Sequence, residues 1–411
     1  MRASIIIPTC DEGANLEKTV RSSLETTTGL DVEVVIADDA STDGSPEEVK
    51  RRFPQVRLAR HAARRGVSQT KDLGARWARG DVLVFLDAHC KPEPGAIERL
   101  VADVEELDGE AVVSPAIANL DVANWENDLG QVGHGYAVAL ETFELWWLPL
   151  EAMPRYDGTR FHTQPTFIGC VAAMSRRLYD RLWGFDTGML VYGTEDIDLG
   201  VRTWLMGYPV LHDPEPLIGH RFRQDVEGHA VPWEHLLSNQ LRMARKVFSD
   251  PVWFDWLDRY SVQQPSAFWE AGWQLYLAGN ESLERERAYL MANRRHDEFW
   301  YAQTFGQRWP MTPFQAASPR PRSSASSSPA PAGGAFSLGP QLAAARTAQT
   351  AQQGNRSHSP APRKGAYSFS PPPPRGFRSF SPPPRRGAYS HSPAPRKGFR
   401  SFSPPPGRKP H

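Results

Sequence analysis

The sequence predicts an α/β fold in which a mostly parallel, twisted sheet is flanked by helices and followed by a helical extension and a disordered C-terminal tail. Three observations predict it. Short β-branched runs alternate with helix-like segments over the first part of the chain. The stretch from Trp233 to Trp300 has a helical pattern and is rich in aromatic residues. The last ~100 residues contain too few clustered apolar side chains to offset the entropy of an ordered chain.

The first part of the chain predicts four strands separated by three helices. Each strand is a β-branched or apolar run that ends at turn-forming residues, and the first helix has Leu16, Val20 and Leu24 on one face. Such alternation is typical of a parallel sheet with helices on both faces. The expected strands are Ser4–Pro8, Val32–Ala37, Val56–Arg60 and Asp81–Leu86, and the expected helices are Asn15–Thr26, Pro46–Arg52 and Val67–Arg79.

The next part of the chain has a weaker pattern. Val112–Ile117 and Ile168–Ser175 are expected strands, while Trp146-Trp147 belongs to an apolar loop or strand. Glu195–Met206 is an expected amphipathic helix, because its apolar residues recur at helical spacing. We therefore divide the chain into a sheet domain over residues 1–225, a Trp-rich helical extension over 226–310 and a basic tail over 311–411.

The net charge of zero conceals two oppositely charged parts. The chain has 47 Lys/Arg and 47 Asp/Glu, yet residues 311–411 contain 15 Lys/Arg and no acidic residue. The first 310 residues therefore carry an excess of 15 negative charges. This distribution, with 21 of the 37 prolines in the tail and all 13 tryptophans before it, excludes a single neutral globular protein.

The tail is repetitive, with SHSPAPRKG at 357–365 and 390–398 and GFRSFSPPP at 376–384 and 398–406. These repeats favour polyproline II conformation, since none offers a hydrophobic face for stacking. The uncompensated positive charge predicts an anionic partner: nucleic acid, a membrane of anionic lipid, or an acidic protein surface. Two alternatives remain open, a solvated and dispensable extension or a tail that folds back on the acidic body.

Composition also bounds the cellular location. No stretch approaches 18 uncharged apolar residues, so we expect no transmembrane segment, and the apolar run at the N-terminus is too short for a signal peptide. Cys10, Cys90 and Cys170 are widely spaced and form no CxxC motif, which argues against a disulfide framework and a structural zinc site. The expectation is a cytoplasmic protein with reduced thiols.

Polar clusters follow three of the predicted strands: Pro8–Glu12, Asp38–Asp43 and Asp87–His89. Ligands of parallel sheets bind beyond the carboxyl ends of the strands, so these clusters predict a site. Asp87 and His89, two residues apart, would point to the same side and could share a divalent cation. A carboxylate with an imidazole suits Mn²⁺ better than Mg²⁺ or Ca²⁺. Alternatively, Asp87 caps a turn and His89 is a surface residue.

Several motifs together resemble a known family. SIIIPTCDEGANLEKTVRSSLETT, VVIADDASTDG, RRGVSQTKDLGARWARGDVLVFLDAHC, YGTEDIDLGVRTWLMGY and GHRFR are similar to a family-2 glycosyltransferase domain with the GT-A fold, over roughly residues 2–225. The DAHC and GHRFR pieces resemble most closely the polypeptide N-acetylgalactosaminyltransferases. The resemblance implies Mn²⁺-dependent (or Mg²⁺-dependent) transfer of a hexose or N-acetylhexosamine from a UDP-sugar to an unknown hydroxyl acceptor.

The same resemblance implies roles for individual residues. Asp39 matches the acidic residue that contacts the uracil or ribose, and Arg64 and Arg223 match arginines that contact the donor and its diphosphate. His220 of GHRFR matches a distant histidine that completes the metal shell. The donor-binding set is then Pro8, Glu12, Asp39, Arg64 and Arg223, and the metal-binding set is Asp87, His89 and His220. Cys10 stands where the resembling N-acetylgalactosaminyltransferases have a histidine, which implies that one uridine contact is changed.

Glu195 and Asp196 are the candidate catalytic pair. In inverting relatives the base of such a pair would match Asp196, whereas in retaining relatives a WGGE glutamate would match Glu195 beside the donor sugar. The chain has Tyr192 and Thr194 where the latter pattern has Trp and Gly, so the stereochemistry stays open. A purely structural role is also open, with Thr194 as N-cap and acidic residues in the first helical turn.

Two other functions fit parts of the sequence. A nucleotidyltransferase on a similar sheet would be expected to have a Gly-rich first loop with basic residues, whereas Pro8–Gly13 has one Gly and no base. The second alternative is a non-catalytic protein that binds a sugar nucleotide or acts as a scaffold through its basic tail. Such a protein would not need all four of Asp87, His89, His220 and Arg223, so their presence argues against it. The transferase is therefore the leading hypothesis.

Overall fold

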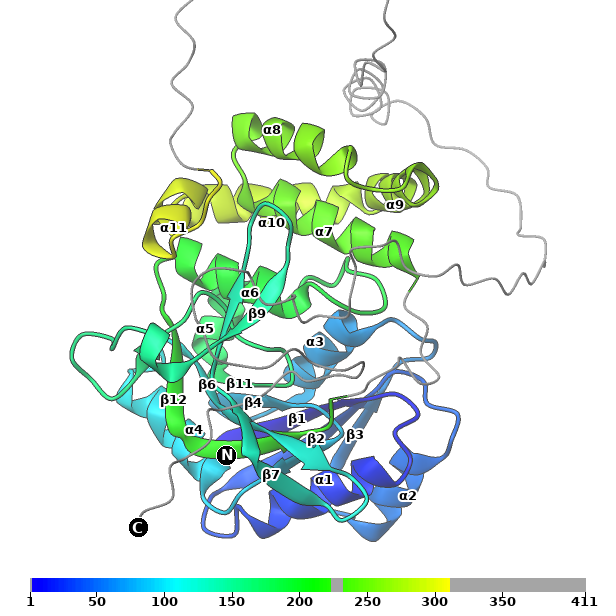
Figure 1. The fold of residues 1–411 in the computed structure, drawn as a ribbon. Coiled ribbons are helices and arrows are strands. Elements are labelled where there is room, and N and C mark those ends of the chain that lie inside the picture. Colours follow the sequence, from blue (N-terminus) through cyan, green and yellow to red (C-terminus); the bar gives the residue numbers. More distant parts are fainter. Residues whose placement is uncertain (1, 223–231, 311–411) are drawn as a thin grey trace, which may run out of the picture.

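A ten-stranded mixed sheet forms the centre of the computed structural model, which describes residues 2–222 and 232–310 (Figure 1). Its main path runs in the order β10–β12–β6–β11–β4–β1–β2–β3, with β5 paired to β12 and β7 paired to β6. The strands are β1 (Ala3–Thr9), β2 (Val32–Asp38), β3 (Arg57–Arg60), β4 (Val82–Leu86), β5 (Cys90–Pro92), β6 (Val112–Asp121), β7 (Glu126–Gly133), β10 (His162–Thr163), β11 (Val171–Ser175) and β12 (Val210–His220).

The four strands predicted first lie next to one another and are parallel. β1 pairs with β2 and β4, and β2 pairs with β3, all in parallel registers. β11 runs antiparallel between β4 and β6, and β12 is parallel to β6. The parallel strands that the sequence predicts are therefore present, within a mixed sheet in which β5, β7, β10 and β11 pair antiparallel with their neighbours. A separate two-stranded sheet, β8 (Gly135–Val138) with β9 (Leu145–Leu148), includes the Trp146-Trp147 segment.

Helices cover both faces of the sheet because its strands are buried on both sides. Ile5 and Ile7 belong to one hydrophobic cluster and Ile6 to the other, as the alternation of strand side chains requires. In Figure 1, α1, α2 and α4 lie on one side of the sheet, and α3, α5 and α6 lie on the other. These helices are α1 (Ala14–Glu25), α2 (Ser45–Arg52), α3 (Val67–Trp77), α4 (Ala96–Glu106), α5 (Arg176–Arg181) and α6 (Glu195–Leu205).

The helical extension packs on the α6 side of the sheet (Figure 1). Its apolar side chains join the same cluster as Ile6 and Phe85, so the extension and the sheet share one continuous core. Trp253, Trp256 and Trp269 are buried in that core. The helices are α7 (Trp233–Val247), α8 (Asp250–Ser261), α9 (Ser266–Ala278), α10 (Asn280–Asn293) and α11 (Glu298–Thr304).

Some predictions fall on parts of the chain that the structure does not describe, and others can be compared directly. Arg223 and the whole of residues 311–411 lie outside the described residues, so the tail prediction has no structural counterpart here. Within residues 2–222 and 232–310, no helix is both long and apolar enough to cross a membrane. The three cysteines are unpaired; Cys90 is buried in β5, and Cys170 is buried directly before β11.

Candidate active site

The loops that follow β1, β2 and β4 meet at one edge of the sheet. The Asp39 amide donates to the Thr9 carbonyl at 2.9 Å, which joins the ends of β1 and β2. The Asp87 amide donates to the Cys170 carbonyl at 2.9 Å, which joins the end of β4 to the residue before β11. This edge therefore brings together the polar clusters that the sequence places after each strand.

Asp87, His89 and His220 converge at this edge. One ligand atom from each lies within 4.8 Å of the other two, and they are the one group of this kind among the described residues. Strand pairing explains the meeting of residues so far apart in sequence: in the β5–β12 ladder His220 stands opposite Cys90, and the Arg221 amide donates to the His89 carbonyl at 3.1 Å. The resulting set of one carboxylate and two imidazoles could hold a divalent cation.

The neighbouring groups keep Asp87 ionised, as a carboxylate ligand of a metal must be. Burial acts to raise the pKa of Asp87, but the hydrogen bond from His220 and the charge of Lys71 outweigh it, so the pKa lies well below its usual value. His89 Nδ1 lies 3.1 Å from Glu12 Oε1. If Nδ1 donates to Glu12, His89 keeps a lone pair on Nε2 for a metal. The structure thus places Glu12 behind His89.

The residues assigned to the donor occupy three different environments. Both carboxylate oxygens of Asp39 accept backbone hydrogen bonds, from Arg65 N at 2.6 Å and from Gly66 N at 2.9 Å, so Asp39 orders the segment that carries Arg64. Arg64 is half exposed and forms an ion pair with Asp11 of the first loop. Pro8 is buried within β1 opposite Ala37 and shapes the strand end.

Glu195 and Asp196 begin α6. Thr194 occupies the N-cap position, as the structural alternative predicts, but its side chain makes no capping hydrogen bond. The physical reason is its backbone: φ is 80°, a left-handed conformation, whereas side-chain caps form from the extended region. The acidic residues in the first turn still lie where the helix dipole favours negative charge, so a structural contribution remains compatible with a catalytic one.

Asp196 is anchored by backbone amides. Its Oδ2 accepts from Gly169 N and its Oδ1 from Ile197 N, both at 2.8 Å. A Cβ built on Gly169 would lie 2.9 Å from Asp196 Oδ2, so a larger residue would displace the carboxylate. Burial, and next the negative charge of Glu195, raise the pKa of Asp196 to about 7. This carboxyl can therefore change its protonation state near neutral pH.

Lys71 is a site residue that the sequence analysis missed. Its side chain is 2% exposed, and Nζ lies 3.0 Å from Glu195 Oε1 and 2.9 Å from the Gly169 carbonyl. Burial acts to lower the pKa of Lys71, but the charges of Glu195, Asp87 and Asp196 outweigh it and raise the pKa. A signal was present: Lys71 precedes Ala75 by four residues and so lies on the buried face of α3, where a lysine needs a partner.

We expect Lys71→Met to destabilise the fold by about 3 kcal/mol, because it leaves the Glu195 carboxylate buried without its cation. Lys50→Met, which removes an exposed lysine, is the control and should cost less than about 1 kcal/mol. Urea unfolding at unchanged m-value measures both. A loss for Lys71→Met no larger than that of the control would contradict the proposed importance of the Lys71–Glu195 pair.

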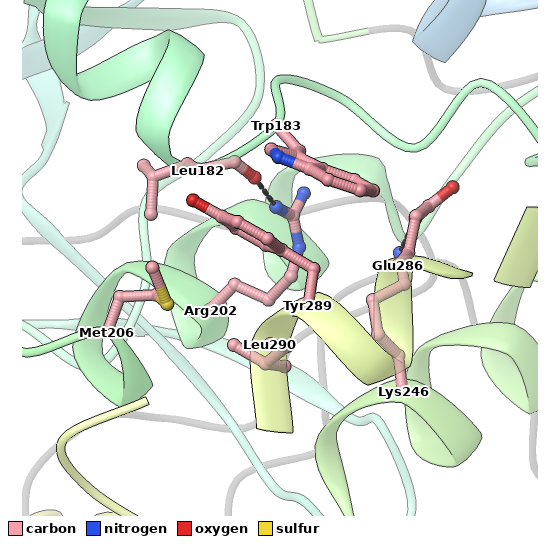
Figure 2. A pocket seen from close by; sticks show the side chains of 8 residues that line it. All are labelled: Leu182, Trp183, Arg202, Met206, Lys246, Glu286, Tyr289 and Leu290. Carbon is pink, nitrogen blue, oxygen red and sulfur yellow. Dashed lines mark hydrogen bonds and ion pairs between the residues drawn. The ribbon is translucent and has the colours of Figure 1, made fainter. Parts of the chain in front are cut away.

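A pocket elsewhere in the molecule contains none of the predicted site residues. Figure 2 shows it between α6, α7 and α10, with Trp183 stacked on Tyr289 at a ring distance of 4.3 Å. Its charged groups are paired: Arg202 with Asp198 at 2.8 Å, and Lys246 with Glu286 at 2.7 Å. Because these charges already neutralise one another, the pocket offers no excess charge to an ionic ligand. We therefore interpret it as a structural feature and not as a ligand-binding site.

Comparison with protein families identifies the sheet domain. Residues 4–183 match the model of glycosyl transferase family 2, and residues 158–221 match a model described as the N-terminal domain of galactosyltransferase. Residues 4–183 therefore match a family 2 glycosyltransferase domain, and the resemblance inferred from the motifs is confirmed.

Individual relatives agree with this assignment. The chain is 32% identical over 271 residues to mouse polypeptide N-acetylgalactosaminyltransferase 6, covering 61% of this chain and 42% of the relative. It is 31% identical over 283 residues to mouse polypeptide N-acetylgalactosaminyltransferase 12, covering 65% and 46%. The chain thus spans less than half the length of these curated relatives.

A solved structure supports the fold. The crystal structure of GalNAc-T7 with UDP, GalNAc and Mn²⁺ superimposes with a TM-score of 0.61 at 22% identity, covering 74% of this chain and 57% of that one. At this level of identity the likeness concerns the fold alone. The predicted GT-A arrangement of the sheet is therefore confirmed.

Proposed function

We propose that this protein is a metal-dependent glycosyltransferase that moves a hexose or N-acetylhexosamine from a UDP-sugar to a hydroxyl acceptor. The observation that carries the proposal is the meeting of Asp87, His89 and His220 at the carboxyl edge of a family 2 glycosyltransferase sheet. The relatives named above as polypeptide N-acetylgalactosaminyltransferases favour an N-acetylhexosamine as the transferred sugar.

The donor atoms present fit a manganese ion. Asp87, His89 and His220 would hold it, since mixed oxygen and nitrogen ligands suit Mn²⁺, while Mg²⁺ and Ca²⁺ prefer oxygen alone. The ion would neutralise charge that develops on the departing UDP diphosphate. The contact between Glu12 and His89 would orient that imidazole, as carboxylates behind metal-bound histidines commonly do.

Other residues would fix the donor and the acceptor. Arg64 stands half exposed beside the first loop, where a fixed positive charge could contact the donor phosphates. Asp39 would act by holding the segment that carries Arg64. Asp196, whose raised pKa lies near neutrality, would accept a proton from the acceptor hydroxyl in an inverting reaction. Glu195, held by Lys71, would instead flank the donor sugar in a retaining one.

The direct test is calorimetric binding of UDP and hydrolysis of UDP-GalNAc, UDP-GlcNAc, UDP-galactose and UDP-glucose, each with and without Mn²⁺. We expect UDP to bind at least ~10-fold more tightly with Mn²⁺, because a bound cation would offset the negative charge of the diphosphate. We also expect one donor sugar to be hydrolysed fastest. GDP serves as the control nucleotide. UDP binding that ignores the metal, or that does not exceed GDP binding, would contradict the proposal.

A further inference from the structure

The segment that leads into Glu195 has an unfavourable backbone conformation. Val191 has φ 52° and Thr194 has φ 80°, and both are β-branched residues that rarely adopt the left-handed region. Gly193 between them has φ 91°, which glycine tolerates. Such strain persists only where surrounding contacts determine the conformation, and it commonly occurs at functional sites. We call residues 190–194 the 190–194 loop. Contacts from other parts of the chain must maintain its unfavourable conformation.

The first contact comes from α3. The Val67 amide donates to the Val191 carbonyl at 2.8 Å. Gly66 lies so close that a Cβ built on it would be 2.5 Å from the Val191 nitrogen. Since Asp39 binds the Gly66 amide, the same short segment touches both the nucleotide side of the proposed site and the 190–194 loop.

The second contact comes from Asn239 of α7, whose side chain is fully buried. Its Oδ1 accepts from Leu190 N at 2.7 Å, and its Nδ2 donates to Leu190 O at 2.9 Å and to Gly193 O at 3.0 Å, with Tyr192 O at 3.4 Å. One amide group thus binds both ends of the loop. Only a side chain with a donor and an acceptor can do this, so neither aspartate nor leucine would replace it.

The same helix also fixes the chain just before the loop. Arg242 and Lys246 each lie 2.7 Å from a carboxylate oxygen of Asp186, and all three side chains are buried. The Ser68 hydroxyl donates to the Asp186 carbonyl at 2.6 Å. α7 therefore binds residues 186–193 at two positions, one at Asp186 and one at the 190–194 loop. The loop contact, made by Asn239, is the one closer in sequence to Glu195.

We propose that Asn239 is a positioning residue for the transfer reaction, which holds the 190–194 loop and so sets Glu195 and Asp196 relative to Asp87. The inference rests on the proposed function. Asn239 lies outside the residues matched by either family model and contacts none of the predicted site side chains through the bonds above. Its effect on the reaction would therefore pass entirely through the backbone of the loop.

The test compares Asn239→Ala with Gln240→Ala in the full chain. Gln240 is the next residue of α7 and is also buried, but its Oε1 accepts from the Tyr260 hydroxyl on α8, away from the loop. We expect Asn239→Ala to lower the rate of donor hydrolysis about 100-fold while the Kd for UDP with Mn²⁺ changes less than ~3-fold. Gln240→Ala should lose comparable stability and keep its rate within ~3-fold. Equal losses of rate in both variants would overturn the inference.

Two further measurements separate positioning from general damage. Asn239→Asp keeps the acceptor for Leu190 N but loses the donors, so its rate relative to wild type should recover partly as lower pH protonates the new carboxyl. Hydrogen exchange should become at least ~10-fold faster over residues 188–194 in Asn239→Ala and stay unchanged there in Gln240→Ala. Unchanged exchange in Asn239→Ala would refute the role of Asn239 in holding the 190–194 loop, even if no UDP-sugar is a substrate. Absent UDP binding in the wild type would instead refute only the proposed function.

Discussion

Replacing Asp87 and His89 together by alanine should remove the metal dependence of UDP binding and lower donor hydrolysis by about 1000-fold. The residues supply two of the three ligand groups that lie within 4.8 Å of one another, and His220 alone cannot retain a divalent cation. The loss corresponds to about 4 kcal/mol of transition-state stabilisation, a size expected when a charge-neutralising metal is lost. Calorimetry of UDP and a Mn²⁺ titration of the rate measure the two effects.

A graded set of variants makes this prediction sharper. Glu12→Gln should weaken Mn²⁺ about 10-fold or more without abolishing the rate at saturating metal, because Glu12 contacts His89 rather than the cation site itself. His296→Ala removes a histidine stacked on Trp300 far from this edge and should leave metal dependence unchanged. Tight, Mn²⁺-dependent UDP binding in the double alanine variant would refute the assignment of the site.

The spacing of Asp87 and His89 predicted a metal-binding pair, but His220 was added only through family resemblance, and the structure explains why composition and periodicity could not predict it. β12, which carries His220, contains Asp213, Pro214 and Pro216 and has a bulge between His212 and Leu217. Such a strand has no alternating pattern, so its pairing with β5 was not predictable from the residues. By contrast, β1, β2 and β4 are continuous apolar runs because both of their faces are buried, and their positions were predicted closely.

The polar residues that support the site were harder still to predict. Lys71 and Asn239 sit on the buried faces of helices, and their partners are Glu195 and the backbone of the 190–194 loop. Neither partner is near in sequence, so no local spacing indicates the contact. A buried lysine or asparagine can be suspected from its helical position, but its partner becomes visible only in the folded chain.

Asp196→Asn should lower the transfer rate by about 1000-fold if the reaction inverts the anomeric centre, because a general base contributes on the order of 10²–10⁴ in rate. In the wild type, the rate should rise with pH through about 7, since burial and the charge of Glu195 raise the pKa of Asp196 to about 7 and only the deprotonated form accepts a proton. The variant should lack this rise. The pH dependence of kcat/KM for both proteins, with the UDP-sugar of the panel that is hydrolysed fastest, provides the measurement.

The pH dependence of the free energy of unfolding gives an independent check on the protonation of Asp196. The pKa of Asp196 is raised above its ordinary value of 3.8, so the folded state binds this proton more tightly than the unfolded state. Its contribution to stability is therefore complete below about pH 4 and is lost as the pH rises through about 7. Asp196→Asn should flatten that part of the stability profile, which urea unfolding at several pH values can follow.

Glu195→Gln distinguishes the two stereochemical courses. If the reaction retains configuration, Glu195 flanks the donor sugar. Glu195→Gln should then lose more of the transfer rate than Asp196→Asn, which should keep most of it. Because Glu195→Gln also leaves Lys71 without its closest charged partner, the stability of this variant must be measured beside its rate. A rate that falls in Asp196→Asn with normal folding, together with a product of inverted configuration, would identify the aspartate as the base. The reverse pattern would assign the decisive role to the Glu195–Lys71 pair.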